Sequence, residues 1–173
     1  MQKIQKPGEG EYAPYALTYI SLVPPDGLVI KHLHDNLINT KALIQSFPLE
    51  KLGVRWAQGE WNIKEILIHI IDTERIFSYR ALRFARNDAT VLAGFEQDAY
   101  VPYSRANERS STDLLEEYSA VRKATLTLLN SLSGEALARI GVVGESKVSV
   151  RALAWMITGH EIHHVNSIRE NYM

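Results

Sequence analysis

The chain has 173 residues, of which 46% are hydrophobic, and its formal net charge is −1 at pH 7. This length and composition fit a single compact domain over residues 1–173. The near-neutral charge gives no electrostatic footprint for nucleic acid, so we expect no nucleic-acid partner. The chain has no cysteine, which excludes disulfides, protein thiolate nucleophiles and Cys-ligated metal. Histidine and carboxylate side chains are the metal ligands that remain.

The first 27 residues show no targeting or membrane signal. The segment from Met1 to Gly8 lacks the apolar core of a signal peptide, and no stretch of the chain approaches the roughly 18 apolar residues of a membrane helix. We therefore expect a cytoplasmic protein with no membrane partner. Residues 1–27 are rich in Gly, Pro and Tyr, so we expect them to wrap the surface, with Asp26 capping the helix that follows.

Two amphipathic helices are expected in the first half of the chain. Apolar residues recur at helical spacing from Ile30 to Ile44, and Phe47-Pro48 ends this run. Asn62 and Glu65 then form a capping-box pattern at the start of a second helix that should reach about residue 87.

Two further helices follow an irregular stretch over residues 88–109. The Ser110 cluster opens the third helix, which Ser133-Gly134 ends, and Ser149 caps the fourth helix. A short helical turn around residues 135–139 and a loop over 141–147 with a little extended structure should connect them. Four helices of this length predict an all-α fold, an antiparallel four-helix bundle, which offers metal sites in its core between facing helices.

The fourth helix carries His160 and His164 within its apolar face. Histidines four residues apart project from one side of a helix, which suits two adjacent corners of a metal's coordination sphere. Polar side chains on an apolar face are costly unless they find partners. A single histidine is ordinarily explained as a core imidazole bonded to a neighbour, but two on one inward face favour a metal.

His69 is the best candidate for a third ligand because it flanks the apolar stripe of the second helix. His34 is the weaker candidate and His32 points further away, so both are interpreted as surface histidines. Three neutral imidazoles from two helices leave one or more coordination positions for water or substrate, which is typical of a catalytic rather than a closed structural site. Such a site accepts Zn, Ni, Fe or Cu, and we expect nickel or zinc.

Glu161 completes a His-Glu-x-x-His pattern that zinc metalloproteases share. Those proteases take their third ligand from residues after the motif, where this chain has Glu170 in place of a histidine, so a protease is not expected. Glu161 is still a candidate general base beside the metal. The alternative is a structural carboxylate ion-paired to a buried arginine such as Arg80.

Several segments resemble the signatures of the DinB-like superfamily, including its YfiT-type members. These segments are Trp61–Asp72 with Arg80–Arg86, Gly94–Tyr100, and Val148–Leu153 through Gly159–His164. The resemblance implies a four-helix bundle, often dimeric, with a divalent metal bound by three histidines that map onto His69, His160 and His164. Its characterised relatives include thiol-dependent enzymes that use bacillithiol or mycothiol, and others are described as metal-dependent hydrolases.

Residues and resemblance together predict a metal-dependent enzyme of the thiol S-transferase type, in which the three-histidine site activates a small thiol or water for a small-molecule substrate. A metal-dependent hydrolase and a non-catalytic metal- or small-molecule-binding bundle are the alternatives. We also expect a homodimer, with Tyr79, Arg83 and Trp155 as candidate subunit contacts. Tyr100 and Tyr103 lie in a segment that forms either a lid or an ordinary packed loop.

Overall fold

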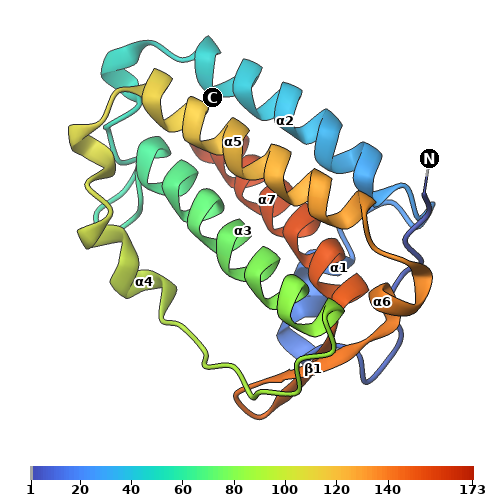
Figure 1. Cartoon of the computed structure of the whole chain (residues 1–173). Coiled ribbons are helices and arrows are strands. Elements are labelled where there is room, and N and C mark those ends of the chain that lie inside the picture. The colour runs from blue at the N-terminus through green and yellow to red at the C-terminus, as the bar shows by residue number, and fades with distance from the viewer. Residues whose placement is uncertain (1) are drawn as a thin grey trace.

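Four long helices form the body of the protein in the computed structural model, which describes residues 2–173 (Figure 1). They are α2 (Val29–Ser46), α3 (Ile63–Ala85), α5 (Ser111–Asn130) and α7 (Val150–Tyr172). The shorter elements are η1 (Pro14–Ala16), α1 (Leu17–Ile20), η2 (Leu49–Lys51), α4 (Gln97–Tyr100), η3 (Val101–Tyr103), η4 (Ala106–Glu108), α6 (Gly134–Ala138), β1 (Ile140–Val143) and β2 (Ser146–Ser149). The predicted four-helix bundle is confirmed, and none of the described helices is long and apolar enough to cross a membrane.

The long helices form a ring in which α2 and α3 are diagonally opposite. Helix α3 packs against α5 and α7, and α2 packs against the same two helices. Helices α3 and α5 run parallel, since Lys64 bonds Arg109 O near their starts and Ser78 bonds Thr125 further along. Helix α7 runs opposite to α3, and α2 runs opposite to α5 (Figure 1). Each long helix therefore has one parallel and one antiparallel neighbour, so the antiparallel arrangement expected from the sequence holds for the α3–α7 and α2–α5 pairs and not for the other two.

The predicted capping box at the start of α3 is confirmed. The Asn62 side chain accepts a hydrogen bond from Glu65 N at 3.0 Å, and the Glu65 carboxylate accepts one from Asn62 N at 2.9 Å. Ser110 and Ser149 likewise cap α5 and α7 as predicted. Each cap binds a backbone N–H that has no partner inside the helix, so these helix starts are set by local sequence.

The predicted cap at Asp26 is wrong. Its carboxylate accepts a hydrogen bond from Leu28 N at 2.8 Å and contacts the His32 ring, but α2 begins two residues later than that cap would require, with Leu28 at its N-cap. Asp26 therefore stabilises the turn before the helix. Because an aspartate binds a backbone N–H two residues ahead as readily in a turn as at a helix start, the sequence pattern did not separate the two.

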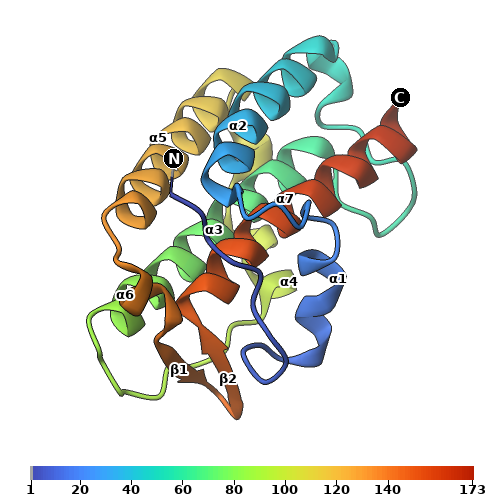
Figure 2. The ribbon, with the colours of Figure 1, turned by 90° about the vertical axis from the view of Figure 1, so that its right-hand side faces the viewer.

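The N-terminal segment contributes to the core, which the prediction that residues 1–27 wrap the surface did not include. Ile4 and Ile20 are buried, and the segment crosses α7 on its way to the β hairpin (Figure 2). Trp155 donates a hydrogen bond from Nε1 to Ile4 O at 3.1 Å and has 0% exposure. Its predicted role as a subunit contact is therefore wrong, because the N-terminal segment covers it.

A two-stranded hairpin closes one end of the bundle. Strands β1 and β2 pair antiparallel, with Ile140 opposite Ser149 and Val143 opposite Ser146, which confirms the extended structure expected between the last two helices. The long connection from α3 to α5 passes this hairpin, where Leu92 N donates to Val142 O at 2.9 Å. The connection then returns along α3 and forms α4 (Figure 1).

Candidate metal centre

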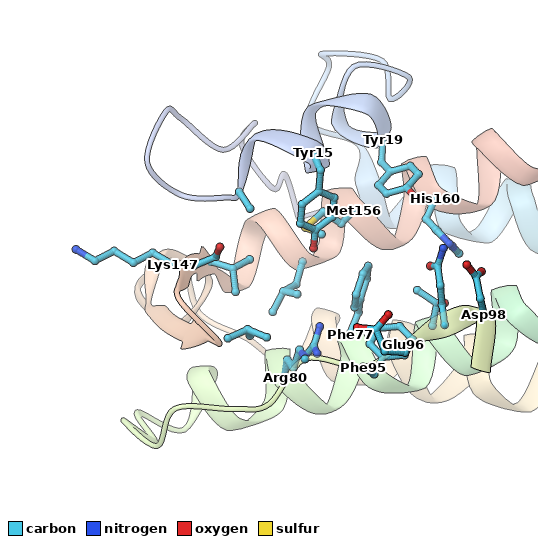
Figure 3. A pocket seen from close by; sticks show the side chains of 18 residues that line it. Tyr15, Tyr19, Phe77, Arg80, Phe95, Glu96, Asp98, Lys147, Met156 and His160 are labelled. Carbon is cyan, nitrogen blue, oxygen red and sulfur yellow. The ribbon is translucent and has the colours of Figure 1, made fainter. Parts of the chain in front are cut away.

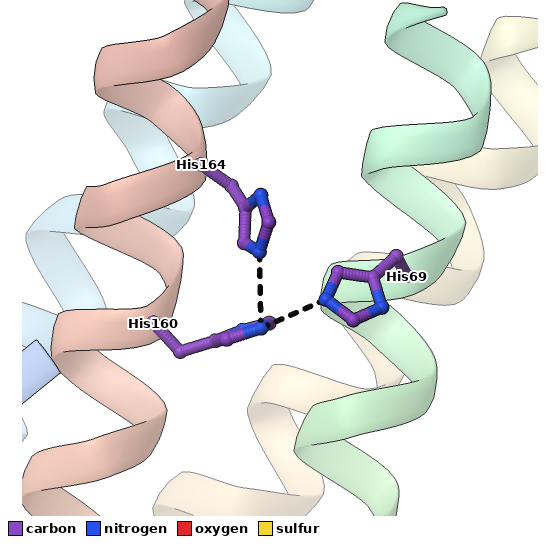
Figure 4. Close-up of side chains that lie close together, drawn as sticks. All are labelled: His69, His160 and His164. Atoms are coloured by element: carbon purple, nitrogen blue, oxygen red, sulfur yellow. Dashed lines mark hydrogen bonds between the residues drawn. The ribbon is translucent and has the colours of Figure 1, made fainter. Parts of the chain in front are cut away.

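The structure brings His69, His160 and His164 together between α3 and α7 (Figure 4). Nε2 of His160 lies 2.9 Å from Nε2 of His69 and 3.1 Å from Nε2 of His164. The three candidate ligand atoms all lie within 4.8 Å of one another. The two residues of α7 meet because they are one helical turn apart, and His69 joins them because α3 packs directly against α7.

The two distances from His160 Nε2 fit a common metal ion. Metal–nitrogen bonds of about 2.0–2.1 Å with coordination angles between 90° and 110° separate two ligand nitrogens by about 2.9–3.4 Å. A neutral imidazole has one N–H donor and one acceptor nitrogen, so three Nε2 atoms aimed at one point do not satisfy one another fully. A cation at their centre would accept all three lone pairs.

Burial keeps the three imidazoles neutral at physiological pH. Burial is the main reason that the pKa of His69 is lowered to about 4 and that of His164 to about 3. Neighbouring histidines contribute to both shifts in the same direction, and Asp98 opposes the shift of His69. The pKa of His160 is also well below its usual value, first by burial and then through His164 and His69. Neutral imidazole is the form that binds a metal, so the site needs no deprotonation before an ion enters.

Aromatic side chains surround the histidines. The Trp61 ring lies 4.8 Å from that of His69, and the Tyr19 ring lies 5.2 Å from that of His160, measured between centroids. Tyr19 comes from α1, which approaches α7 closely at Gly159, where a Cβ atom would lie 2.0 Å from Tyr19 O. This glycine therefore allows the N-terminal segment to bring an aromatic ring to the site.

A cavity of about 490 Å³ opens beside the histidines (Figure 3). Its wall combines side chains of η1, α1, α3, α7, the hairpin, and α4 with the segment before it. They include Tyr15, Tyr19, Thr73, Phe77, Arg80, Phe95, Glu96, Asp98, Lys147, Met156 and His160. The cavity thus has His160 at one end, a mixed aromatic and aliphatic wall, and charged groups of both signs.

Glu161 faces a different side of α7 from His160. Its Oε1 accepts hydrogen bonds from Thr40 of α2, at 2.7 Å, and from the Tyr118 hydroxyl of α5. Its Oε2 accepts one from Arg122 at 2.7 Å. The side chain borders a separate cavity of about 110 Å³ between α2 and α7, which shares no lining residue with the large one. These contacts favour the prediction that Glu161 is a structural carboxylate over the prediction that it is a general base.

Glu161 pairs with Arg122. The structural role predicted from the sequence named Arg80 as an example of the buried partner, and Arg80 is not that partner. Arg122 is fully buried and also donates two hydrogen bonds to Glu74, at 2.9 and 2.8 Å. Its pKa is raised well above the usual value because the carboxylates of Glu161 and Glu74 outweigh the effect of burial. The sequence signal for this residue was a charged side chain inside the apolar stripe of α5, between Tyr118 and Thr125.

The other predicted residues lie outside the histidine cluster. His34 is exposed, and His32 contacts Asp26 at the start of α2, as expected for surface histidines. His163 is exposed, with its ring 5.0 Å from that of His164.

Tyr100 packs against Phe95 at a centroid distance of 5.6 Å, and neither Tyr100 nor the exposed Tyr103 lines the large cavity.

The DinB superfamily model matches residues 32–168, which include all three histidines. This chain belongs to the DinB superfamily. Its fold is similar to that of YfiT from Bacillus subtilis, described as a probable metal-dependent hydrolase with an unusual four-helix bundle topology. The TM-score is 0.77 and the identity 13%, over 86% of this chain and 87% of YfiT. No curated protein matches the chain.

Two further solved structures share the fold of this DinB superfamily member. The DinB-like protein YjoA from Bacillus subtilis has a TM-score of 0.61 and 19% identity, over 83% of this chain and 87% of YjoA. A mycothiol-dependent maleylpyruvate isomerase has a TM-score of 0.66 and 10% identity, over 84% of this chain and 61% of the isomerase. At these identities the comparisons show a common fold.

Proposed function

We propose that this protein is a metal-dependent enzyme whose divalent ion, nickel or zinc, is held by His69, His160 and His164. The observation that carries the proposal is the convergence of three neutral imidazole nitrogens at the end of a cavity of about 490 Å³. Cavities of about 300–1,000 Å³ bind small organic molecules. Three protein ligands leave at least one coordination position open to a molecule in the cavity.

The reaction that we propose is transfer of a small thiol to an electrophilic substrate. A divalent ion lowers the pKa of a coordinated thiol or water and so supplies a nucleophile near neutral pH. The chain has no cysteine, so the reacting sulfur would come from a separate small molecule. The fold shared with a mycothiol-dependent isomerase supports a thiol, and the fold shared with YfiT, a probable metal-dependent hydrolase, supports water as the second candidate.

The protein's side chains would bind and shield the reactants. Phe77 and Met156 form apolar wall beside His160, and Tyr19 covers the His160 ring. Excluding bulk water in this way strengthens electrostatic interactions inside the site. Glu161, held by Thr40, Tyr118 and Arg122, would fix the orientation of α7 on the side away from the cavity.

The experiment that tests this function is turnover with a panel of low-molecular-weight thiols and electrophilic acceptors, run beside a panel of hydrolysable esters and amides. Activity should disappear on chelation and return with nickel or zinc. Turnover in the thiol panel alone supports the transferase, and turnover without thiol supports the hydrolase. Metal-loaded protein that is inert in both panels would leave only a binding function.

A further inference from the structure

Arg80 lines the large cavity as a buried cation that has no acidic partner in the part of the chain that the structure describes. Its side chain lies at the end of the cavity away from His160 (Figure 3), and the residue is only 5% exposed. Nη2 donates a hydrogen bond to Ala93 O at 2.9 Å, and among residues 2–173 no carboxylate oxygen lies within 4.0 Å of the guanidinium. The other donors of the guanidinium are therefore free to bind a ligand.

Arg122 is a buried arginine with a structural role, and its contacts can be compared with those of Arg80. It donates to both Glu74 and Glu161, so its charge is compensated on two sides. Arg80 has no such compensation, and burial lowers its pKa, opposed only by Tyr15 and Tyr100. A buried charge without a partner destabilises a fold, and an anion in the cavity would remove that penalty.

The surroundings of Arg80 favour a carboxylate over a phosphate. The guanidinium carbon lies 5.8 Å from the centre of the Phe77 ring and 5.5 Å from that of Phe95, so aromatic groups cover it. Its planar N–H donors match the two oxygens of a carboxylate. One buried cation compensates one negative charge. The lining has one other cation, the exposed Lys147, and two acidic residues, Glu96 and Asp98. A phosphate dianion would keep uncompensated charge in this site.

The distance along α3 sets the shape of the ligand. His69, Thr73 and Arg80 share one face of the helix, and eleven residues at about 1.5 Å each separate the backbones of His69 and Arg80 by about 16 Å. Thr73 lies between them, lines the cavity and is 2% exposed, and its Oγ1 has no hydrogen-bond partner among the described residues. A molecule that spans the cavity would therefore be elongated, with room for a polar group midway.

We propose that the cavity binds an elongated small molecule whose carboxylate pairs with Arg80 and whose thiol reaches the metal at His69, His160 and His164. This inference rests on the proposed function, because the thiol end of the ligand needs the metal. It names the class of thiol substrate: a thiol that carries a single carboxylate at its far end.

Linear mercapto acids of different length test this proposal, because the chain length sets the distance between thiol and carboxylate. The protein is loaded with cobalt, and binding of mercaptopropionate, mercaptohexanoate and mercaptooctanoate is followed by the sulfur-to-cobalt charge-transfer absorption. Each acid is compared with the mercapto alcohol of the same length and with the corresponding mercaptoalkyl phosphate. We expect one of the longer acids to bind on the order of tenfold to a hundredfold tighter than its alcohol, and the shortest acid to show no such preference.

Two variants test whether Arg80 causes the preference for the acid over the alcohol. Arg80→Met keeps the volume of the side chain and removes its charge, so acid and alcohol should then bind within about twofold of each other. Arg86→Met removes an exposed arginine from the end of the same helix and should keep the full preference. If Arg80→Met does not fold, the comparison of acid with alcohol in the unaltered protein still decides.

The outcomes separate this inference from the proposed function. Equal binding of acids and alcohols of every length, with a clear charge-transfer band, would overturn the carboxylate site and leave the thiol-binding metal centre standing. Tighter binding of the phosphate than of the acid would also overturn it. Absence of the band with every thiol, in protein that contains cobalt, would instead count against the proposed thiol chemistry.

Discussion

His160 and Glu161 are adjacent in the sequence but belong to different parts of the molecule. His160 faces α3 and lines the large cavity, whereas Glu161 faces α2 and α5 and borders the small one. Consecutive residues of a helix point about 100° apart, so this division follows from helical geometry. It separates the candidate metal centre from the buried ion-pair cluster on the other side of α7.

Metal content tests the three histidines directly. Protein purified without a His-tag should contain about one divalent ion per chain, because a single three-histidine site is present among the described residues. Each of three single replacements by alanine, at His69, His160 or His164, should reduce the metal content strongly. The replacement His32→Ala should not. Elemental analysis gives the result, and a full complement of metal in His69→Ala would remove that residue from the site.

Replacement of Glu161 separates its two predicted roles. Glu161→Gln weakens the buried pair with Arg122, so we expect a loss of about 2–4 kcal/mol in the free energy of unfolding, measured in urea. The exposed ion pair of Glu135 with Arg139 provides the control, and Glu135→Gln should cost less than about 1 kcal/mol. If instead Glu161→Gln keeps its stability and metal and loses turnover, Glu161 is the base.

The metal-free protein should lose stability as the pH falls. The pKa values of His69 and His164 are lowered to about 4 and about 3 in the folded state, from about 6.5 when exposed. Below about pH 6.5 the unfolded chain binds protons that the folded chain does not, so the free energy of unfolding falls, by up to roughly 1.4 kcal/mol per pH unit for each histidine. Above that pH their contribution is constant.

Urea unfolding of the metal-free protein between pH 7.5 and pH 4.5 measures this dependence. The variant His69→Gln should flatten the curve because it removes one of the buried titrating groups. His34→Gln is the matched control, since His34 is exposed, and it should leave the slope unchanged. An equal slope in all three proteins would show that the buried histidines do not cause it.

Gly159 should be needed for the approach of α1 to α7. In Gly159→Ala the new methyl group would lie 2.0 Å from Tyr19 O, so the segment that carries Tyr19 must shift. We expect a loss of about 1–3 kcal/mol in the free energy of unfolding. Gly53→Ala is the control because nothing lies within 4 Å of its added methyl group. Similar stabilities of the two variants would contradict the close contact.

We propose that the protein is a homodimer that uses the exposed side of α3. Tyr79 is half-exposed, and Arg83 stacks over its ring at 5.4 Å while also pairing with Asp88. Light scattering at micromolar concentration should give twice the mass of the chain, and Tyr79→Ser should weaken the dimer. Tyr103→Ser, which changes an exposed tyrosine after α4, should not. A monomeric mass of the unaltered protein would exclude this assembly.

The sequence by itself determined the features that depend on neighbouring residues. The caps at Asn62, Ser110 and Ser149 form between residues three apart, and the shared direction of His160 and His164 follows from the helical repeat. Apolar periodicity likewise predicted the long helices and therefore the bundle. Each of these outcomes needs only a local hydrogen bond or the geometry of one helix, so the pattern of residue types was sufficient.

The tertiary structure alone decided the surroundings of Glu161, Arg80 and Trp155. The diagonal placement of α2 and α3 puts Arg122, rather than Arg80, against Glu161, and leaves Arg80 facing the cavity without a carboxylate. The N-terminal segment buries Trp155, which periodicity placed on an outer face. These contacts join residues 39 to 151 positions apart, and they depend on how whole helices pack, which no local pattern encodes.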